Sequence, residues 1–415
     1  MNPMTKCGAA VLALCFFLTA CASQPPQPPT ETTASPTEVL TPIDTAAQPE
    51  TDAPIASPID GDMTTRIHFV AAGDNIIHEA VFTDAKQNAA VLASTGGARV
   101  DYAFASMYDG LAPLISGADL AYVNHESPIA RSKPITGYPD FNSPTDAGRD
   151  LLAVGFDVVN IANNHMLDMG EAGLNESIEY WNSTGATVLG ACSRANYDAD
   201  NLRIVEVQGI KIAFLSYAEM INWSHANALS AGSRYVVPYA KDADIKRQMA
   251  GARASGADLI FVAIHWGDEG KFQPNAEQKR LAQLLADEGA DVILGSHSHN
   301  IQPVQWLTGA NGNKTLVAYS TGNLISTMLY SYYMVGGLLT FDIVAEPGAE
   351  AQIENVVFVP TVTHYSMNRD SLALYRLSDY TAELAAAHGA QKNGAFTLAT
   401  LQKYVTDTID PVFLP

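Results

Sequence analysis

Six short apolar segments of this chain are each followed at once by polar side chains of the kind that bind metal ions or phosphate. Their length and β-branched content predict buried strands at residues 67–72, 120–123, 158–162, 259–264, 292–295 and 316–319. The polar endings are Gly73-Asp74-Asn75, Asn124-His125-Glu126-Ser127, Asn163-Asn164-His165 with Asp168, His265-Trp266-Gly267-Asp268-Glu269, Ser296-His297-Ser298-His299 and Ser320-Thr321-Gly322-Asn323. Ligands of α/β sheets bind at the carboxyl ends of the strands. These six endings therefore predict one polar site at that edge.

The segments between and around these strands predict an α/β fold. Residues 276–288 carry apolar side chains at helical spacing, and strands that alternate with helices are typical of layered α/β domains. Two strand pairs, residues 202–207 with 211–217 and residues 338–344 with 353–359, make the predicted sheets mixed rather than purely parallel. Two further helices, predicted to close the same domain, are residues 375–387 and 395–408.

The bulk composition limits the classes of function. With 415 residues, of which 47% are hydrophobic, the chain can bury a large core. The net charge of −21 argues against a nucleic-acid partner, because phosphate contacts need clustered Lys and Arg. The sequence offers only basic pairs such as Lys246-Arg247 and Lys279-Arg280. Cys192 is the single cysteine beyond residue 21, which excludes an intrachain disulfide framework or a paired-cysteine metal site in the body of the chain.

The first 21 residues have the pattern of a bacterial lipoprotein signal peptide. Lys6 precedes an apolar run over residues 8–18, which is shorter than the ~20 residues that cross a bilayer. The run ends in Leu18-Thr19-Ala20-Cys21, which resembles the lipobox, where the cysteine is lipidated and becomes the mature N-terminus. We therefore expect Cys21 to anchor an extracytoplasmic protein to the cell membrane. An ordinary signal peptide that happens to end near a cysteine is the alternative.

The segment over residues 22–62 is rich in Pro, Thr, Ser and Ala and has almost no aromatic residues. Such a segment cannot bury enough apolar surface to offset its chain entropy. We expect a flexible tether there, followed by a single folded domain over residues 63–415.

The types of polar residue at the strand ends favour a divalent metal. Asp, Glu, Asn and His without Cys suit Mn, Zn, Fe or Mg, and one or two such ions are expected. His297 and His299 point the same way if their backbone is extended, so both imidazoles could face one ion. Each residue also has a structural interpretation. Asp74 could form a turn or cap a helix, and His265 could bond a backbone carbonyl. Asp268 and Glu269 could belong to a solvated acidic loop. Trp266 could pack against the wall of the site, and Asn323 could be structural.

The ordered motifs resemble those of the bacterial capsule-synthesis CapA family over roughly residues 66–361. The motifs are Gly73-Asp74, Asn124-x-Glu126, Asn163-Asn164-His165 with Asp168 and Gly170, His265-Trp266-Gly267-x-Glu269, Gly295-x-His297-x-His299 and Tyr319-Ser320-x-Gly322-Asn323. That family is similar in fold to the calcineurin-like metallophosphoesterases. The resemblance implies a four-layer αββα sandwich of the metallo-dependent phosphatase-like type.

The resemblance also implies roles for individual residues. By that likeness, one metal ion would be held by Asp74, Glu126 and His299. A second would be held by Glu126 as a bridging ligand with Asn164, His265 and His297. His165, with Asp168, would act beside the substrate as a general acid or an oxyanion partner. Substrate contacts are expected from Asn75, Asn124, Trp266, Glu269 and Asn323. Two departures are that Asn75-Ile76 follow Asp74 in place of the Asp-x-His of phosphoesterases, and that Glu126 replaces a bridging Asp.

The function implied by the resemblance is a part in the synthesis or export of a capsule of poly-γ-glutamate or a related surface polymer. The expected partners are the anionic polymer or its precursor, the membrane through the lipid anchor, and other capsule-synthesis membrane proteins. The alternative is a metal-dependent hydrolase that cleaves a phosphoester, amide or ester bond of another cell-envelope component. A chain of net charge −21 should repel a polyanion, unless bound divalent ions supply positive charge.

Overall fold

The computed structural model describes residues 64–415. The predicted signal peptide, the predicted lipidation site Cys21 and the predicted tether lie outside the described residues. Within residues 64–415, no helix is both long and apolar enough to cross a membrane.

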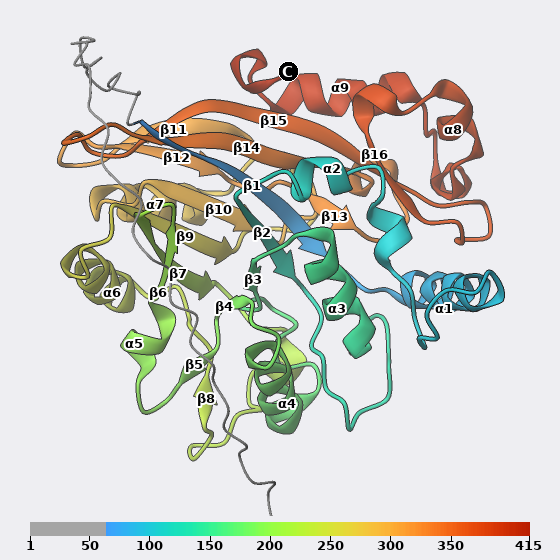
Figure 1. The fold of residues 1–415 in the computed structure, drawn as a ribbon, viewed down its shortest axis with the longest axis horizontal. Helices are drawn as coiled ribbons and strands as arrows, with labels where there is room; N and C mark the ends of the chain where they lie inside the picture. The colour runs from blue at the N-terminus through green and yellow to red at the C-terminus, as the bar shows by residue number, and fades with distance from the viewer. Residues whose placement is uncertain (1–63) are drawn as a thin grey trace, which may run out of the picture. The chain divides into compact units, whose positions relative to one another are not determined.

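The first of two large sheets has eight strands in the order β16-β15-β14-β1-β2-β3-β4, with β13 pairing alongside β1 (Figure 1). Its parallel half runs from β1 through β2 and β3 to β4, while β14, β15 and β16 are antiparallel. The bounds are β1 Thr65–Asn75, β2 Leu120–His125, β3 Val158–Asn160, β4 Thr187–Leu189, β13 Asn323–Ile325, β14 Val335–Ala345, β15 Gln352–His364 and β16 Ala373–Arg376.

The second sheet has six strands in the order β11-β12-β10-β9-β7-β6. The four inner strands are parallel, and each edge strand is antiparallel to its neighbour. The bounds are β6 Arg203–Val207, β7 Ile210–Ala218, β9 Leu259–His265, β10 Val292–Ser296, β11 Val304–Thr308 and β12 Lys314–Ala318. A small two-stranded sheet pairs β5, Cys192–Ser193, with β8, Tyr235–Val236.

The two large sheets pack face to face between helical layers. Phe261 of β9 meets Phe69 of β1 edge-on at 5.2 Å between ring centroids, and Phe69 stacks on Phe341 of β14 at 4.8 Å. Outside the second sheet, Met249 of α6 and Leu285 of α7 belong to a separate apolar cluster. Helix α9 packs along β14 of the first sheet, and α4 packs beside β4 (Figure 1). This arrangement is the predicted four-layer αββα sandwich. The helices are α1 Glu79–Ser94, α2 Ala112–Ile115, α3 Thr145–Val154, α4 Gly170–Asn182, α5 Tyr197–Asn201, α6 Asp242–Ala254, α7 Ala276–Asp287, α8 Ala382–Ala387 and α9 Leu398–Thr408.

One predicted helix is partly wrong. Residues 375–387 begin in strand β16, where Tyr375 pairs with Val362 of β15, and only α8 at the end of the segment is α-helical. Cross-strand pairing decides the conformation of Tyr375, because the apolar spacing fits either structure over so few residues. The predicted helix over residues 276–288 is confirmed as α7, which begins with a capping box between Asn275 and Gln278.

A repeated Gly-x-Asp step precedes four of the parallel strands, β2, β3, β9 and β10. In each step an Asp oxygen accepts the backbone N–H of a residue on the neighbouring strand, and this bond helps to fix the register of the two strands. The four acceptor–donor pairs are Asp119 with His68 at 2.7 Å, Asp157 with Ala121 at 2.9 Å, Asp258 with Lys211 at 2.8 Å and Asp291 with Ile260 at 2.7 Å. These bonds lie at the amino ends of the strands, so the opposite ends, which carry the polar residues, come to a common edge.

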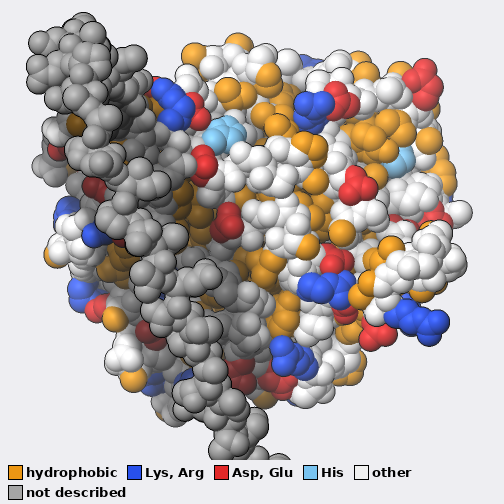
Figure 2. Space-filling view, in the orientation of Figure 1, with side chains coloured by type: hydrophobic (Ala, Val, Ile, Leu, Met, Phe, Trp, Pro, Cys, Tyr) orange, Lys and Arg blue, Asp and Glu red, His pale blue; other side chains and the backbone are white. Residues whose placement is uncertain are grey.

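The charges on the described surface are interspersed. Figure 2 shows Lys and Arg side chains scattered among Asp and Glu rather than gathered into one basic patch on this face. Both basic pairs singled out in the sequence follow this pattern. Arg247 bonds Asp198 and Asp244, and Arg280 bonds Asp242 and Glu277.

Candidate metal centre

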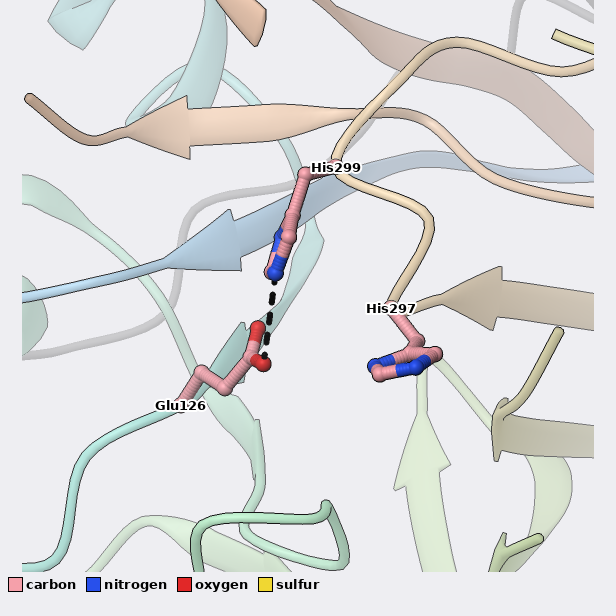
Figure 3. Close-up of side chains that lie close together, drawn as sticks. All are labelled: Glu126, His297 and His299. Atoms are coloured by element: carbon pink, nitrogen blue, oxygen red, sulfur yellow. Dashed lines mark ion pairs between the residues drawn. The ribbon is translucent and has the colours of Figure 1, made fainter. Parts of the chain in front are cut away.

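The candidate site lies at the carboxyl ends of parallel strands from both large sheets. Asp74 is the penultimate residue of β1, and Glu126 follows the last residue of β2. From the second sheet, His265 ends β9 and His297 follows β10. Figure 3 shows Glu126, which follows β2, turned toward His297 and His299, which lie on the loop after β10. The structure thus brings together the five carboxylate and imidazole residues predicted as metal ligands, His299 included.

Glu126 is the central residue of the cluster. Its side chain is completely buried, and neither carboxylate oxygen accepts a hydrogen bond from any described residue. Its Oε1 lies 3.4 Å from His265 Nε2 and 3.9 Å from His299 Nε2. Burial, followed by the nearby charges of Asp74 and Glu269, raises the pKa of Glu126 well above its ordinary value. A buried carboxylate without a donor is costly, and a bound cation would compensate it.

Two overlapping groups of side chains have ligand atoms that lie within 4.8 Å of one another. One is Glu126 with His297 and His299, and the other is Asp74 with Glu126 and His265. Glu126 belongs to both groups, as expected for a bridging ligand. The resemblance implies one ion held by Asp74, Glu126 and His299, whereas these two groups place Asp74 with His265, and His299 instead contacts Asp74 directly through Nδ1 at 3.0 Å. Carboxylate and imidazole donors without thiolate fit a hard or borderline divalent ion.

His297 and His299 converge for a different reason from the one predicted. The backbone here is not extended, since both residues have positive φ, 94° and 58°. The His297 N–H donates to Asp74 Oδ2 at 3.2 Å, which stabilises the bend. The two ring centroids are 6.0 Å apart. The expectation that both imidazoles face the site is compatible with this bend, but the extended geometry is wrong.

His265 has side-chain partners on both ring nitrogens rather than the backbone carbonyl considered as an alternative. Its Nδ1 lies 2.8 Å from Ser296 Oγ, and its Nε2 lies 2.9 Å from Asn164 Oδ1. His297 Nδ1 is 3.0 Å from the same Nε2. Burial lowers the pKa of His265 well below its ordinary value. The imidazole is therefore neutral, as a metal ligand must be.

His299 is oriented by two residues of the first sheet. Its Nδ1 lies 3.0 Å from Asp74 Oδ2 and 3.1 Å from Asn323 Oδ1. Burial by itself would lower the pKa of His299, but the hydrogen bond and the charge of Asp74 raise it overall. Asn323, predicted as a substrate contact, is buried, and its amide also donates to Tyr333 O at 3.0 Å. In this arrangement Asn323 positions His299.

His165 and Asp168 form a pair beside the cluster. The His165 Nδ1 and Asp168 Oδ2 atoms are 2.6 Å apart, and the same carboxylate oxygen accepts the Phe141 N–H at 2.8 Å. The ring of Phe141 packs edge-on against His165 at 4.7 Å. The carboxylate therefore accepts the Nδ1–H of the imidazole, and the other ring nitrogen, Nε2, takes no part in this hydrogen bond.

Three residues predicted to contact substrate are completely buried and engaged elsewhere. The Asn75 amide bonds Tyr108 and His125, and the Trp266 indole N–H donates to Tyr319 O at 2.9 Å within the apolar cluster behind the second sheet. Asn124 donates to Asp74 Oδ1 at 2.8 Å and so orients a candidate ligand. Neither Asn75 nor Trp266 has exposed surface in this structure, because the side chains that follow a strand alternate between its two faces. Glu269 is exposed, and its charge reaches Glu126 and His299.

The sequence interpretation missed residues of a segment that carries no recognisable motif. Asn222 contacts Asn164, His165 and Asp168. His225, which was given no role, lies 2.8 Å from Asp140 Oδ1 and 3.9 Å from Asp168 Oδ1. Neither spacing nor periodicity connects this segment to the strand ends, so only the folded chain reveals it.

The fold and the site together define a class: an α/β sandwich protein with a buried cluster of carboxylate and imidazole side chains, candidate ligands of a divalent metal, at the strand ends. Within that class, the chain belongs to the bacterial capsule synthesis protein family PGA_cap, whose sequence profile matches residues 68–328. It is 26% identical over 223 residues to the PGA biosynthesis protein CapA of Bacillus subtilis, covering 53% of this chain and 56% of that protein. It is 28% identical over 233 residues to the capsule biosynthesis protein CapA of Bacillus anthracis, covering 54% of each. The chain therefore spans about half the length of these relatives.

Solved structures with which the chain aligns include a calcineurin-like phosphoesterase, YfkN of Bacillus subtilis, at a TM-score of 0.42 and 13% identity, covering 83% of this chain and 96% of that one. Another is the NAD nucleotidase NadN of Haemophilus influenzae, at a TM-score of 0.41 and 12% identity, covering 83% of this chain and 60% of that one.

Proposed function

We propose that this protein takes part in the synthesis or export of an anionic capsule polymer, poly-γ-glutamate or a related chain, and that its buried cluster holds one or two divalent metal ions. Family membership and the names of the Bacillus relatives support the biological role. The ligand types at the strand ends support the metal site.

The observation that carries the metal proposal is the unpaired carboxylate of Glu126. Two carboxylates and three imidazoles meet in a buried space, and the Glu126 oxygens find no donor among the described residues. Asp74, by contrast, already accepts hydrogen bonds from Asn124 and His297. A divalent ion bound by Glu126, His297 and His299, or by Asp74, Glu126 and His265, would balance this charge and supply Lewis acidity to a substrate oxygen.

Bound cations also answer the charge conflict between the protein and its proposed polymer. The arginines of the two Lys-Arg pairs are engaged by acids, Arg247 by Asp198 and Arg280 by Asp242. Ions at the cluster would then provide positive charge where a carboxylate of the polymer could bind.

A second candidate function is a metal-dependent hydrolase that acts on a phosphoester, amide or ester bond of a cell-envelope component. The 2.6 Å contact between His165 and Asp168 favours it, because a carboxylate-oriented imidazole beside a metal cluster can give or take a proton at Nε2. The test compares the metal-loaded wild type with a His165→Ala variant on a broad substrate panel and in capsule formation. This candidate is rejected if the wild type cleaves no substrate and both proteins behave alike in the two assays.

The placement of the protein in the cell is part of the proposal. We propose that residues 1–21 are a lipoprotein signal, that Cys21 carries the lipid, and that residues 22–62 tether the domain of residues 63–415 outside the cytoplasm. Metabolic labelling with a clickable fatty acid should mark the wild-type protein and not a Cys21→Ser variant. Equal labelling of both would reject the anchor.

The experiment that tests the metal proposal is metal stoichiometry by plasma mass spectrometry on protein purified without chelator. We expect about one to two equivalents of Mn, Zn or Fe in the wild type and loss of the metal in a His297→Ala/His299→Ala variant. Binding of Mg is tested by adding Mg to the purified protein before the measurement. Polymer pull-down with and without chelator then tests the role of the ion. Absence of metal after loading would reject the metal site, and chelator-insensitive polymer binding would reject its part in capture.

A further inference from the structure

Asn222 contacts both halves of the candidate site from a separate loop. It precedes the short 3-10 helix Trp223–His225, between strands β7 and β8. We infer that Asn222 is a positioning residue that orients the metal ligand Asn164 and the His165–Asp168 pair at the same time. The inference rests on the proposed function, because it assigns a role within that site.

On the metal side, Asn222 fixes which end of the Asn164 amide faces the cluster. The Asn164 Nδ2 donates to Asn222 Oδ1 at 2.9 Å, and the Asn222 backbone N–H donates to Asn164 O at 3.1 Å. Because the amide nitrogen is held by Asn222, the amide oxygen points to His265 Nε2 at 2.9 Å. Only the oxygen of an amide can bind a cation, so a rotated amide would remove Asn164 from the candidate ligands.

On the other side, the same Asn222 side chain contacts the proton-transfer pair. Its Nδ2 lies 3.4 Å from Asp168 Oδ1 and 3.1 Å from His165 Nδ1. Asp168 Oδ2 accepts the Nδ1–H of His165 at 2.6 Å, so the Asn222 amide donates to the remaining oxygen of that carboxylate, Oδ1. The Asn222 amide thus accepts from the candidate metal ligand Asn164 through Oδ1 and donates to Asp168, the partner of His165, through Nδ2.

The loop that carries Asn222 is tied to a second segment of the site. His225 Nε2 lies 2.8 Å from Asp140 Oδ1, and the next residue after Asp140, Phe141, donates its N–H to Asp168. Trp223, between these anchored residues, is 92% exposed. The position of Asn222 is therefore set by contacts within the site rather than by burial of its neighbour in a core.

Two variants of Asn222 separate its two contacts. Asn222→Ala removes both the acceptor and the donor, whereas Asn222→Asp keeps an acceptor for Asn164 and removes the donor to Asp168. We expect Asn222→Ala to weaken Mn²⁺ affinity about 10-fold or more in calorimetric titrations, as removal of residues that support metal ligands does. Asn222→Asp should bind Mn²⁺ within about 3-fold of the wild type, which corresponds to less than ~1 kcal/mol. Trp223→Ala on the same loop is the matched control and should bind like the wild type.

The second readout is the protonation pattern of His165 in metal-free protein, measured by ¹⁵N NMR of labelled histidine and assigned with His165→Ala. Both Asn222 variants should shift the His165 ring signals or their pH profile, while Trp223→Ala should not. Thermal unfolding checks that all variants fold. Wild-type metal affinity and unchanged His165 signals in a folded Asn222→Ala protein would overturn the inference. If the wild type itself binds no metal, the proposed metal site fails, and the NMR result still decides the contact with His165.

Discussion

Replacing Glu126 by Gln should stabilise the metal-free protein and should remove the stabilisation that a bound metal gives. The carboxylate is fully buried, both oxygens lack a donor among the described residues, and the nearest imidazole nitrogen is 3.4 Å away on a neutral ring. A buried unpaired polar group costs ~1–3 kcal/mol, and more when it is charged. In chelator, Glu126→Gln should therefore raise the free energy of unfolding by ~1–3 kcal/mol.

With metal present, the Gln variant should lose its stability advantage, so that the wild type is equally stable or more stable. A ligand that binds only the folded state at 100 times its Kd stabilises it by ~2.7 kcal/mol. The wild type should gain this amount on addition of Mn²⁺, and the Gln variant should gain little because it lacks the shared ligand. Urea unfolding in chelator and in excess Mn²⁺ measures both values.

The pH dependence of the metal-free protein gives a second check on Glu126. Its folded pKa is raised from the ordinary value of 4.5 by burial and then by the charges of Asp74 and Glu269. A carboxyl with a raised folded pKa contributes stability below pH 4.5, and this contribution is lost as the pH rises through the folded pKa. Wild-type stability relative to the Gln variant should therefore fall from pH 4.5 upward.

Asp74→Asn is the matched control for this prediction. The Asp74 carboxylate already accepts the Asn124 amide at 2.8 Å and the His297 N–H at 3.2 Å, so its loss should destabilise the metal-free protein by ~1.5–3 kcal/mol. If Glu126→Gln lowers stability in chelator as Asp74→Asn does, the view of Glu126 as an unpaired carboxylate awaiting a cation is refuted.

Three further predictions concern residues away from the ligands. Burial raises the pKa of Asp291 from 3.8 to about 6, so its stabilising contribution below pH 3.8 is lost as the pH rises to about 6. Asp291→Asn keeps the acceptor for the Ile260 N–H, and its free energy of unfolding relative to the wild type should rise by up to ~3 kcal/mol between pH 4 and pH 7. Stability curves of the two proteins that stay parallel over this pH range would contradict the prediction. Gly295→Ala would place its Cβ 2.1 Å from Tyr319 O and should cost ~1–3 kcal/mol in urea unfolding, together with weaker metal binding, whereas wild-type values would contradict the close approach. Burial raises the pKa of Cys192 to about 12, so its peptide should stay unalkylated at pH 8 until urea unfolds the chain, and rapid labelling of the native protein would contradict its burial.

Much of the architecture follows from the sequence because the signals are local. Runs such as β9 and β10 are apolar and β-branched, and the helix α7 has both its spacing and its capping residues in one short stretch. Polar residues at the carboxyl ends of neighbouring parallel strands must lie near one edge, so the convergence of Asp74 and Glu126 needed no tertiary information. The convergence of these two residues with His265 needed the packing of the second sheet on the first. The family motifs added the layer order and the candidate roles.

Some local signals were present but were not interpreted. The Gly-x-Asp step before four strands is a short repeat in the sequence, yet its meaning depends on which strand lies beside each Asp. Asp157, for example, accepts the N–H of Ala121, which is 36 positions away. Strand neighbours are a property of the sheet, so the repeat could not be assigned to register without them.

Tertiary structure alone decided which polar residues face the cluster. Asn75 and Trp266 have motif positions as good as those of Asp74 and His265, but the alternation of side chains sends them into other contacts. The bend at His297 and His299 depends on a hydrogen bond to Asp74, more than two hundred positions earlier. Asn222 joins the site through a loop whose sequence has no distinguishing pattern. Periodicity and motif spacing describe neighbours along the chain, whereas a site is made by groups that only folding brings within 3 to 4 Å of one another.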